Sequence, residues 1–151
     1  MERYYHVGIV VPDLERAKEH FSDLLHLEWG PVLETDIEVR LDDGVDRVFP
    51  NKIVYSSGPP YLELIQETPG SPWVCNEHSN LHHIGFFTGA FTAEAERLVA
   101  SACPLEMYGG HGDGPPTTFT YHRDPWGVRI ELVDDEIRPT MEQFLFGADG
   151  T

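Results

Sequence analysis

Hydrophobic and polar residues along the chain change their period several times, and each change marks a predicted element. Residues 5–11 are rich in β-branched and aromatic side chains, which is typical of a strand. Asp13 can cap a helix that follows this strand. After a break at residues 29–31 the sequence becomes strand-like again, with strands predicted at 53–55 and 61–65. The predicted helix has apolar residues at helical spacing, namely Leu14, Ala17, Phe21, Leu24 and Leu25.

The same succession begins again after a loop at residues 68–80 that is rich in Pro, Gly, Ser and Asn. A strand is predicted at 81–88, and Thr92 is the predicted cap of a second helix. Further strands are predicted at 105–108, 119–123 and 128–133, and a short helix near 141–146. The chain therefore has the order βαβββ twice, in modules at 1–67 and 81–134. The linker is 68–80 and the C-terminal tail is 135–151, within one structural domain.

The two modules also resemble each other in sequence. YYHVGIVV at the start of the first matches LHHIGFFT at the start of the second, which places His6 over His83 and Gly8 over Gly85. YLELIQ near the end of the first matches RIELVD near the end of the second. Two matches in the same order and at equivalent places indicate a duplicated unit. The sequence thus predicts an α+β fold made of two tandem βαβββ modules.

Composition and charge narrow the choice of partner. The 151 residues are 40% hydrophobic and 24% charged, as expected for a globular protein, and the formal net charge is −16. This charge repels phosphate backbones and anionic lipids, so no nucleic-acid or membrane partner is expected. No bilayer-spanning run and no secretory signal are recognised, so we expect a cytoplasmic protein. Its two cysteines form no CxxC motif and are expected to be free thiols.

The duplicated positions carry the candidate chemistry. Each module has one His and one Glu in the middle of a predicted strand. Alternation along the strand places their apolar neighbours on the opposite face. A carboxylate there is costly unless it is paired or binds a metal. A satisfied core histidine, or a glutamate paired with an arginine, would explain any one position alone. Together the four residues make a set of two nitrogen and two oxygen ligands that suits a divalent ion and leaves room for substrate oxygens. They are His6, Glu63, His83 and Glu131.

Other candidates have weaker support from their positions. Tyr121 and His122 lie on a predicted strand near Glu131 and either reach the cleft or lie outside it, and for His122 we expect the surface. Tyr55 and Trp126 either line a pocket or pack in the core.

The motifs HVGIVVPDLERAKEHF, YLELIQ, LHHIGFF and DPWGVRIELVD resemble those of the vicinal oxygen chelate superfamily, over nearly the whole chain to Asp134. This superfamily includes glyoxalase I, methylmalonyl-CoA epimerase, extradiol dioxygenases and antibiotic-resistance proteins. The resemblance implies open, curved mixed sheets that pair around a metal-binding cleft, with the helices outside. It assigns the metal to His6, Glu63, His83 and Glu131, and the repeat register selects His83 over His82. Bacterial-type glyoxalase I has a similar ligand set, whereas the epimerases usually have Gln where Glu63 stands.

The resemblance implies a metal-dependent lyase or isomerase that stabilises an enolate-like intermediate during proton transfer next to a carbonyl of a small molecule. The expected cofactor is a divalent ion (Zn, Ni, Co, Mn or Fe), and Glu63 or Glu131 is the expected catalytic base. The alternatives are a protein that sequesters an antibiotic-like molecule and, less favoured because of Glu63, a ring-cleaving dioxygenase. Use of glutathione or coenzyme A stays open at this point, and a homodimer is expected. The candidate cations for such a co-substrate are Arg3, Arg16, Arg40 and Arg47.

Overall fold

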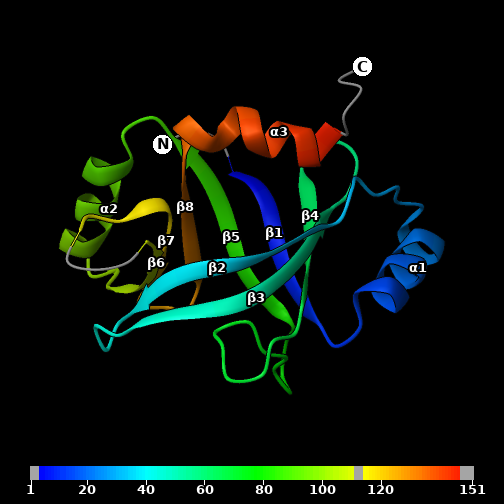
Figure 1. Cartoon of the computed structure of the whole chain (residues 1–151), viewed down its shortest axis with the longest axis horizontal. Helices are drawn as coiled ribbons and strands as arrows, with labels where there is room; N and C mark the ends of the chain where they lie inside the picture. Colours follow the sequence, from blue (N-terminus) through cyan, green and yellow to red (C-terminus); the bar gives the residue numbers. More distant parts are fainter. Residues whose placement is uncertain (1–3, 111–113, 147–151) are drawn as a thin grey trace.

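The computed structural model describes residues 4–110 and 114–146, and its elements follow the predicted order (Figure 1). The first module contains β1 (Tyr4–Val11), α1 (Leu14–Leu25), β2 (Leu33–Leu41), β3 (Asp46–Tyr55) and β4 (Tyr61–Gln66). The second contains β5 (Leu81–Thr88), α2 (Phe91–Ala100), β6 (Leu105–Gly109), β7 (Thr117–Arg123) and β8 (Arg129–Asp134). A 3-10 turn, η1 (Asp135–Ile137), leads into α3 (Arg138–Phe146).

The eight strands form a closed barrel in the order β1-β4-β3-β2-β6-β7-β8-β5. Each module contributes its strands in the same spatial order, and the modules meet along β1–β5 and β2–β6. The β1–β4 and β5–β8 pairs are parallel and the others are antiparallel, so the predicted α+β class with a mixed sheet is confirmed. The sheets are not open as expected. The register of Val39 with Gly109 and of Leu41 with Met107 joins β2 to β6 and closes the barrel.

Alternation along the strands divides the apolar side chains between the inside of the barrel and its two helix-covered flanks. The largest buried cluster lies inside and includes Ile65, Phe87 and Val133. Leu64 on the outer face packs with residues of α1, and Leu132 packs with residues of α2. Figure 1 shows α1 and α2 at opposite sides of the barrel, while α3 runs past the upper ends of β8, β5 and β1. Side chains that share a face with Ile65 or Val133 therefore point into the barrel.

The ends of some elements differ from the sequence prediction. Asp13 caps α1 as expected, since its carboxylate accepts a hydrogen bond of 3.0 Å from the Arg16 amide. Thr92 does not cap α2, because this helix begins at Phe91 and has no side-chain cap. The first turn of α2 is held by the buried ring of Phe91, which belongs to the same apolar cluster as Leu132 of β8.

Strand β3 begins seven residues earlier than predicted, at Asp46. Its first half mixes charged and apolar residues and contains Pro50, so it carries no clear strand signal, yet it pairs with β2 from Asp46 to Ile53. This segment is a strand because it pairs with β2, and not because its own residues favour a strand.

Cys75 and Cys103 are both free thiols. Within residues 4–110 and 114–146, no helix has the length and apolar character needed to span a membrane.

Candidate metal centre

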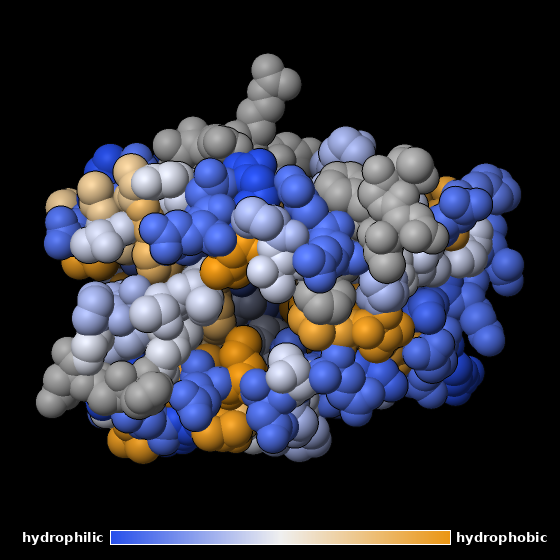
Figure 2. All heavy atoms as spheres, turned by 45° about the horizontal axis from the view of Figure 1, so that its top comes forward, coloured by the Kyte–Doolittle hydropathy of each residue, from blue (hydrophilic) through white to orange (hydrophobic). Residues whose placement is uncertain are grey.

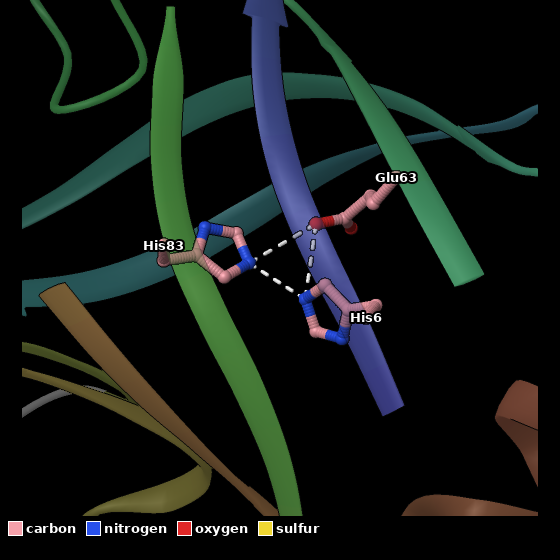
Figure 3. A group of neighbouring side chains, drawn as sticks. All are labelled: His6, Glu63 and His83. Atoms are coloured by element: carbon pink, nitrogen blue, oxygen red, sulfur yellow. Dashed lines mark hydrogen bonds and ion pairs between the residues drawn. The ribbon is translucent and has the colours of Figure 1, made fainter. Parts of the chain in front are cut away.

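The structure brings the four duplicated residues together at one point inside the barrel. They come from four neighbouring strands, β4, β1, β5 and β8, and Figure 3 shows three of them, His6, Glu63 and His83, pointing toward one another. Nε2 of His6 lies 2.6 Å from Nε2 of His83. The Glu63 carboxylate lies 3.3 Å and 3.2 Å from these nitrogens, and the Glu131 carboxylate 3.0 Å and 3.4 Å. All four residues are between 0% and 8% exposed.

Glycines in the neighbouring strand create the space for both imidazole rings. In the antiparallel β1–β5 pair, His6 is opposite Gly85 and Gly8 is opposite His83. A Cβ atom at Gly85 would lie 2.0 Å from Cε1 of His6, and one at Gly8 would lie 2.2 Å from Cε1 of His83. Each module therefore provides the glycine that accommodates the histidine of the other. The repeated His-x-Gly motif is the sequence signature of this reciprocal packing.

The charges of the cluster stabilise one another. Burial opposes the charged form of His6, but the Glu63 and Glu131 carboxylates outweigh burial and raise the pKa of His6 to about 9. The same carboxylates raise the pKa of His83 against the effect of burial. Burial raises the pKa of both glutamates, yet the neighbouring imidazoles lower it overall. The cluster thus favours ionised carboxylates at neutral pH.

The donor atoms fit a divalent metal ion. One nitrogen or oxygen atom each from His6, Glu63 and His83 lies within 4.8 Å of the others, and Glu131 reaches both imidazoles. Two nitrogens and two carboxylate oxygens suit Zn²⁺ and other first-row ions, and two carboxylates balance a divalent charge in a buried site. The second ring nitrogen of His6, Nδ1, is buried without a hydrogen-bond partner. The imidazole of His6 is held by packing against the rings of Tyr5 and Tyr55.

His82, which sequence reasoning passed over, orients His83. Its Nε2 lies 3.0 Å from the Pro72 carbonyl oxygen, which can only accept, so Nε2 of His82 carries a hydrogen. Burial lowers the pKa of His82 to about 3, so its ring is neutral and Nδ1 accepts a hydrogen bond of 2.9 Å from Nδ1 of His83. When His83 is neutral, its Nε2 therefore bears the lone pair that a metal ion needs. The adjacent position in LHHIGFF was the only sequence signal for this role.

Two tyrosines repeat the symmetry of the site. Tyr55 pairs with Glu63 across β3–β4, and Tyr121 pairs with Glu131 across β7–β8. Their rings face the histidines, at 5.6 Å from His6 and 5.0 Å from His83 between centroids. Burial and the nearby carboxylates raise the pKa of both tyrosines well above the usual value. Both therefore keep a neutral hydroxyl beside the cluster.

Other sequence candidates lie elsewhere. The prediction of a surface position for His122 is wrong, because its ring is fully buried and hydrogen-bonded to the Cys103 carbonyl and the Thr120 hydroxyl. Strand alternation places it on the face opposite Tyr121. Trp126 neither lines the cavity beside the cluster nor packs in the core, because its side chain is 90% exposed. Arg40 and Arg47 form ion pairs with Asp46 and Asp43, and Arg3 lies outside the described residues.

Comparison with known proteins gives a family match and similar solved structures. A model of the glyoxalase/bleomycin resistance protein/dioxygenase superfamily matches residues 5–121. A variant of Streptomyces coelicolor methylmalonyl-CoA epimerase in complex with 2-nitronate-propionyl-CoA is 20% identical, with a TM-score of 0.61 over 89% of this chain and 97% of that chain.

Methylmalonyl-CoA epimerase from Mycobacterium tuberculosis is 20% identical, with a TM-score of 0.58 over 87% and 86% of the two chains. A hypothetical protein from Bacillus halodurans is 14% identical, with a TM-score of 0.58 over 88% and 94%. At these identities the likeness concerns the fold. No match was found among curated proteins.

We predict that Gly85→Ala destabilises the protein by about 1–3 kcal/mol, because the added methyl group overlaps the buried ring of His6. Gly89→Ala is the matched control, since a Cβ at Gly89 meets no atom within 4 Å. Urea unfolding of both variants and of the wild type measures the difference. Equal midpoints for the two variants would contradict the packing described for β1 and β5.

The raised pKa of His6 predicts a stability that depends on pH in the metal-free protein. The stabilisation is fully present below the unfolded pKa of about 6.5 and is lost as pH rises through about 9. The lowered pKa of Glu63 adds stabilisation that is lost in acid. With EDTA present, we expect the free energy of unfolding to fall by about 3 kcal/mol between pH 6 and 9.5.

The control for this measurement is a variant pair. His6→Gln removes the titrating group, so its stability should change much less over the same interval. His20→Gln alters an exposed histidine and should keep the wild-type pH dependence. A wild-type protein with constant stability from pH 6 to 9.5 would refute the charge coupling of the cluster.

Proposed function

Because the chain belongs to the glyoxalase/bleomycin resistance protein/dioxygenase superfamily, we propose that it is a divalent-metal-dependent enzyme of the glyoxalase or epimerase type. Its reaction moves a proton next to a carbonyl group of a small molecule. The observation that supports this proposal is the convergence of two imidazoles and two carboxylates at one buried point. The four residues were also selected by their repeat positions in the sequence.

Nε2 of His6, Nε2 of His83 and one oxygen each of Glu63 and Glu131 would hold the ion, which could be Zn, Ni, Co, Mn or Fe. A bound ion of this kind supplies Lewis acidity at a substrate carbonyl oxygen, which acidifies the neighbouring C–H bond. The histidines hold their positions through Gly8, Gly85 and His82, so the donor atoms are arranged before any ligand arrives.

The carboxylates are the groups of the cluster that can accept the proton. Glu63 and Glu131 line a cavity inside the barrel, whereas neither histidine lines it. Their lowered pKa keeps them ionised at neutral pH, as a base requires. We propose that one of them removes the proton from the carbon next to the carbonyl and returns it there or to the adjacent atom.

The main alternative is a protein that sequesters a small molecule without turning it over. The apolar lining of the cavity favours this alternative, because such a lining holds a ligand without any chemistry. A ring-cleaving dioxygenase has less support, since Glu63 adds a protein ligand at a position that oxygen activation needs open. The homodimer stays a prediction, which light scattering at micromolar concentration tests.

We predict that the wild-type protein binds one divalent ion, and that Glu131→Gln weakens this binding by at least about 100-fold, since it removes a charged ligand and leaves the ion with excess charge in a buried site. Glu63→Gln should have a milder effect of about tenfold, in keeping with the amide that epimerases usually have there. Calorimetric titration with Zn²⁺, Mn²⁺, Ni²⁺ and Co²⁺ measures the affinities. Glu34→Gln, on an exposed part of β2, is the control and should bind like the wild type.

A second experiment tests the reaction class. Hydroxyacetone is a small α-hydroxyketone whose protons next to the carbonyl exchange with solvent when an enolate forms. In D₂O, the metal-loaded protein should accelerate this exchange, measured by proton NMR, and Glu131→Gln should abolish the acceleration. Tight metal binding with no exchange, either of hydroxyacetone or of 2,4′-dihydroxyacetophenone, would overturn the enzyme proposal in favour of sequestration. Absence of metal binding would overturn the site assignment itself.

A further inference from the structure

We propose that the substrate of this site is a compact, uncharged aromatic carbonyl compound with a second neutral polar group at its far end. Its carbonyl end meets Glu63 and Glu131, and its far end hydrogen-bonds to Asn51. Phosphate-bearing or carboxylate-bearing carriers, such as coenzyme A thioesters and glutathione adducts, are excluded. This proposal deepens the function proposed above and rests on it for the chemistry at the carbonyl end.

The cavity beside the cluster has the size and lining of a small aromatic molecule. Its volume is about 270 Å³, near the lower end of the range for small-molecule sites. Ile137 and Met141, from η1 and α3, form one wall and limit the length of a ligand. Figure 2 looks onto the α3 side of the molecule and shows a hollow flanked by hydrophobic residues near the centre of this face.

Aromatic side chains form much of the opposite lining. The rings of Trp73 and Tyr121 are edge-on to each other at 6.4 Å, and the indole Nε1 donates a hydrogen bond of 3.3 Å to the Tyr121 hydroxyl. Phe119 lies 5.4 Å from Tyr121 between ring centroids. Since these polar tips are already paired, the rings offer apolar faces and edges to a ligand. Such surfaces favour an aromatic ring in offset or edge-to-face contact.

Asn51 on β3 is the polar group that the protein itself does not use. It is 8% exposed and lines the cavity, and its carboxamide makes no hydrogen bond to another described residue. Among the described residues, the fully buried side-chain atom without a partner is Nδ1 of His6, so the Asn51 carboxamide faces the open space of the cavity, where a ligand can pair with it in place of water. A carboxamide is neutral and both donates and accepts, so a hydroxyl or carbonyl group matches it.

The position of Asn51 gives the ligand its length. Tyr55, which pairs with Glu63, lies four residues further along β3, so Asn51 is about 13 Å along the strand from the level of the carboxylates. The apolar side chain of Ile53 lines the cavity between these two levels. Along β3 the cavity thus has polar groups at the levels of Glu63 and of Asn51, where Thr35 lies opposite on β2, and an apolar side chain between them, as a para-substituted aromatic ketone does.

No basic residue is among the described residues that line this cavity. A phosphate or carboxylate on the ligand would face Glu63 and Glu131 without a compensating cation in the described lining, in a protein of net charge −16. Each lysine and arginine on the barrel strands and at the start of α3 is paired with a carboxylate, namely Arg40, Arg47, Lys52, Arg123, Arg129 and Arg138.

Calorimetric titration of the Zn²⁺-loaded protein at pH 6.5 with two matched ketones tests the proposal. The first is 2,4′-dihydroxyacetophenone, and the second is 2-hydroxyacetophenone, which lacks the distal hydroxyl. We expect the first to bind about tenfold more tightly, as one additional hydrogen bond predicts. Acetyl-coenzyme A and S-lactoylglutathione should neither bind nor displace it.

Asn51→Leu is the diagnostic variant, because it keeps the size of the side chain and removes its hydrogen-bonding groups. In this variant the two ketones should bind equally, with the affinity of the second ketone unchanged from the wild type. Asn76→Leu, in an exposed loop away from the cavity, should keep the tenfold difference. Loss of affinity for both ketones alike in Asn51→Leu would overturn the role of Asn51.

The outcomes separate this inference from the proposed function. Binding of acetyl-coenzyme A or S-lactoylglutathione, or absence of binding by both ketones in a protein that binds Zn²⁺, overturns the substrate class and leaves the metal site intact. Ketone binding that depends on Asn51, in a protein that shows no proton exchange, supports the substrate class and overturns the enzyme reaction.

Discussion

The reciprocal packing of two histidines against two glycines across β1 and β5 is the constraint on which the centre of this protein depends. These strands are the seam between the modules, and each imidazole occupies space that the glycine of the other module leaves open. The two Nε2 atoms therefore meet at 2.6 Å inside the barrel. Any side chain larger than hydrogen at Gly8 or Gly85 would force one ring out of this position, so the pairing of the modules and the formation of the site are one event.

Closure of the barrel gives the cluster its electrostatic character. Because β2 joins β6, the inner face of every strand is shielded, and Glu63 and Glu131 become almost completely buried. Burial alone would disfavour the charged form of both carboxylates, and only the imidazoles that face them reverse this effect. The site is thus a buried set of mutually compensating charges. With its imidazoles neutral, such a set has the ligand types and the two negative charges that suit a divalent cation.

The same closure separates the chemistry from the rest of the cavity. The carboxylates of Glu63 and Glu131 share the cavity with a mostly apolar and aromatic lining, and Asn51 lies four residues from the level of Glu63 along β3. The basic residues of the strands are held in ion pairs with carboxylates. The similar solved structures include an epimerase in complex with 2-nitronate-propionyl-CoA. A shared fold does not fix the ligand, so the proposal of an uncharged ligand rests on the lining of this cavity and not on the fold.

The sequence by itself determined the duplicated order of elements, the α+β class and the four positions that converge. These features are periodic or repeated, and alternation along a strand reports which residues share a face without reference to any distant segment. The hydrogen bonds of His82, the place of Asn51 in the cavity lining, the burial of His122 and the closure through β2 and β6 were decided by tertiary structure alone. Each of these features depends on residues that are distant in the sequence. The Pro72 carbonyl, which sets the tautomer of His82, is an example. Lateral contacts between strands leave no periodic signal in one sequence, because register and neighbours arise only when the barrel closes.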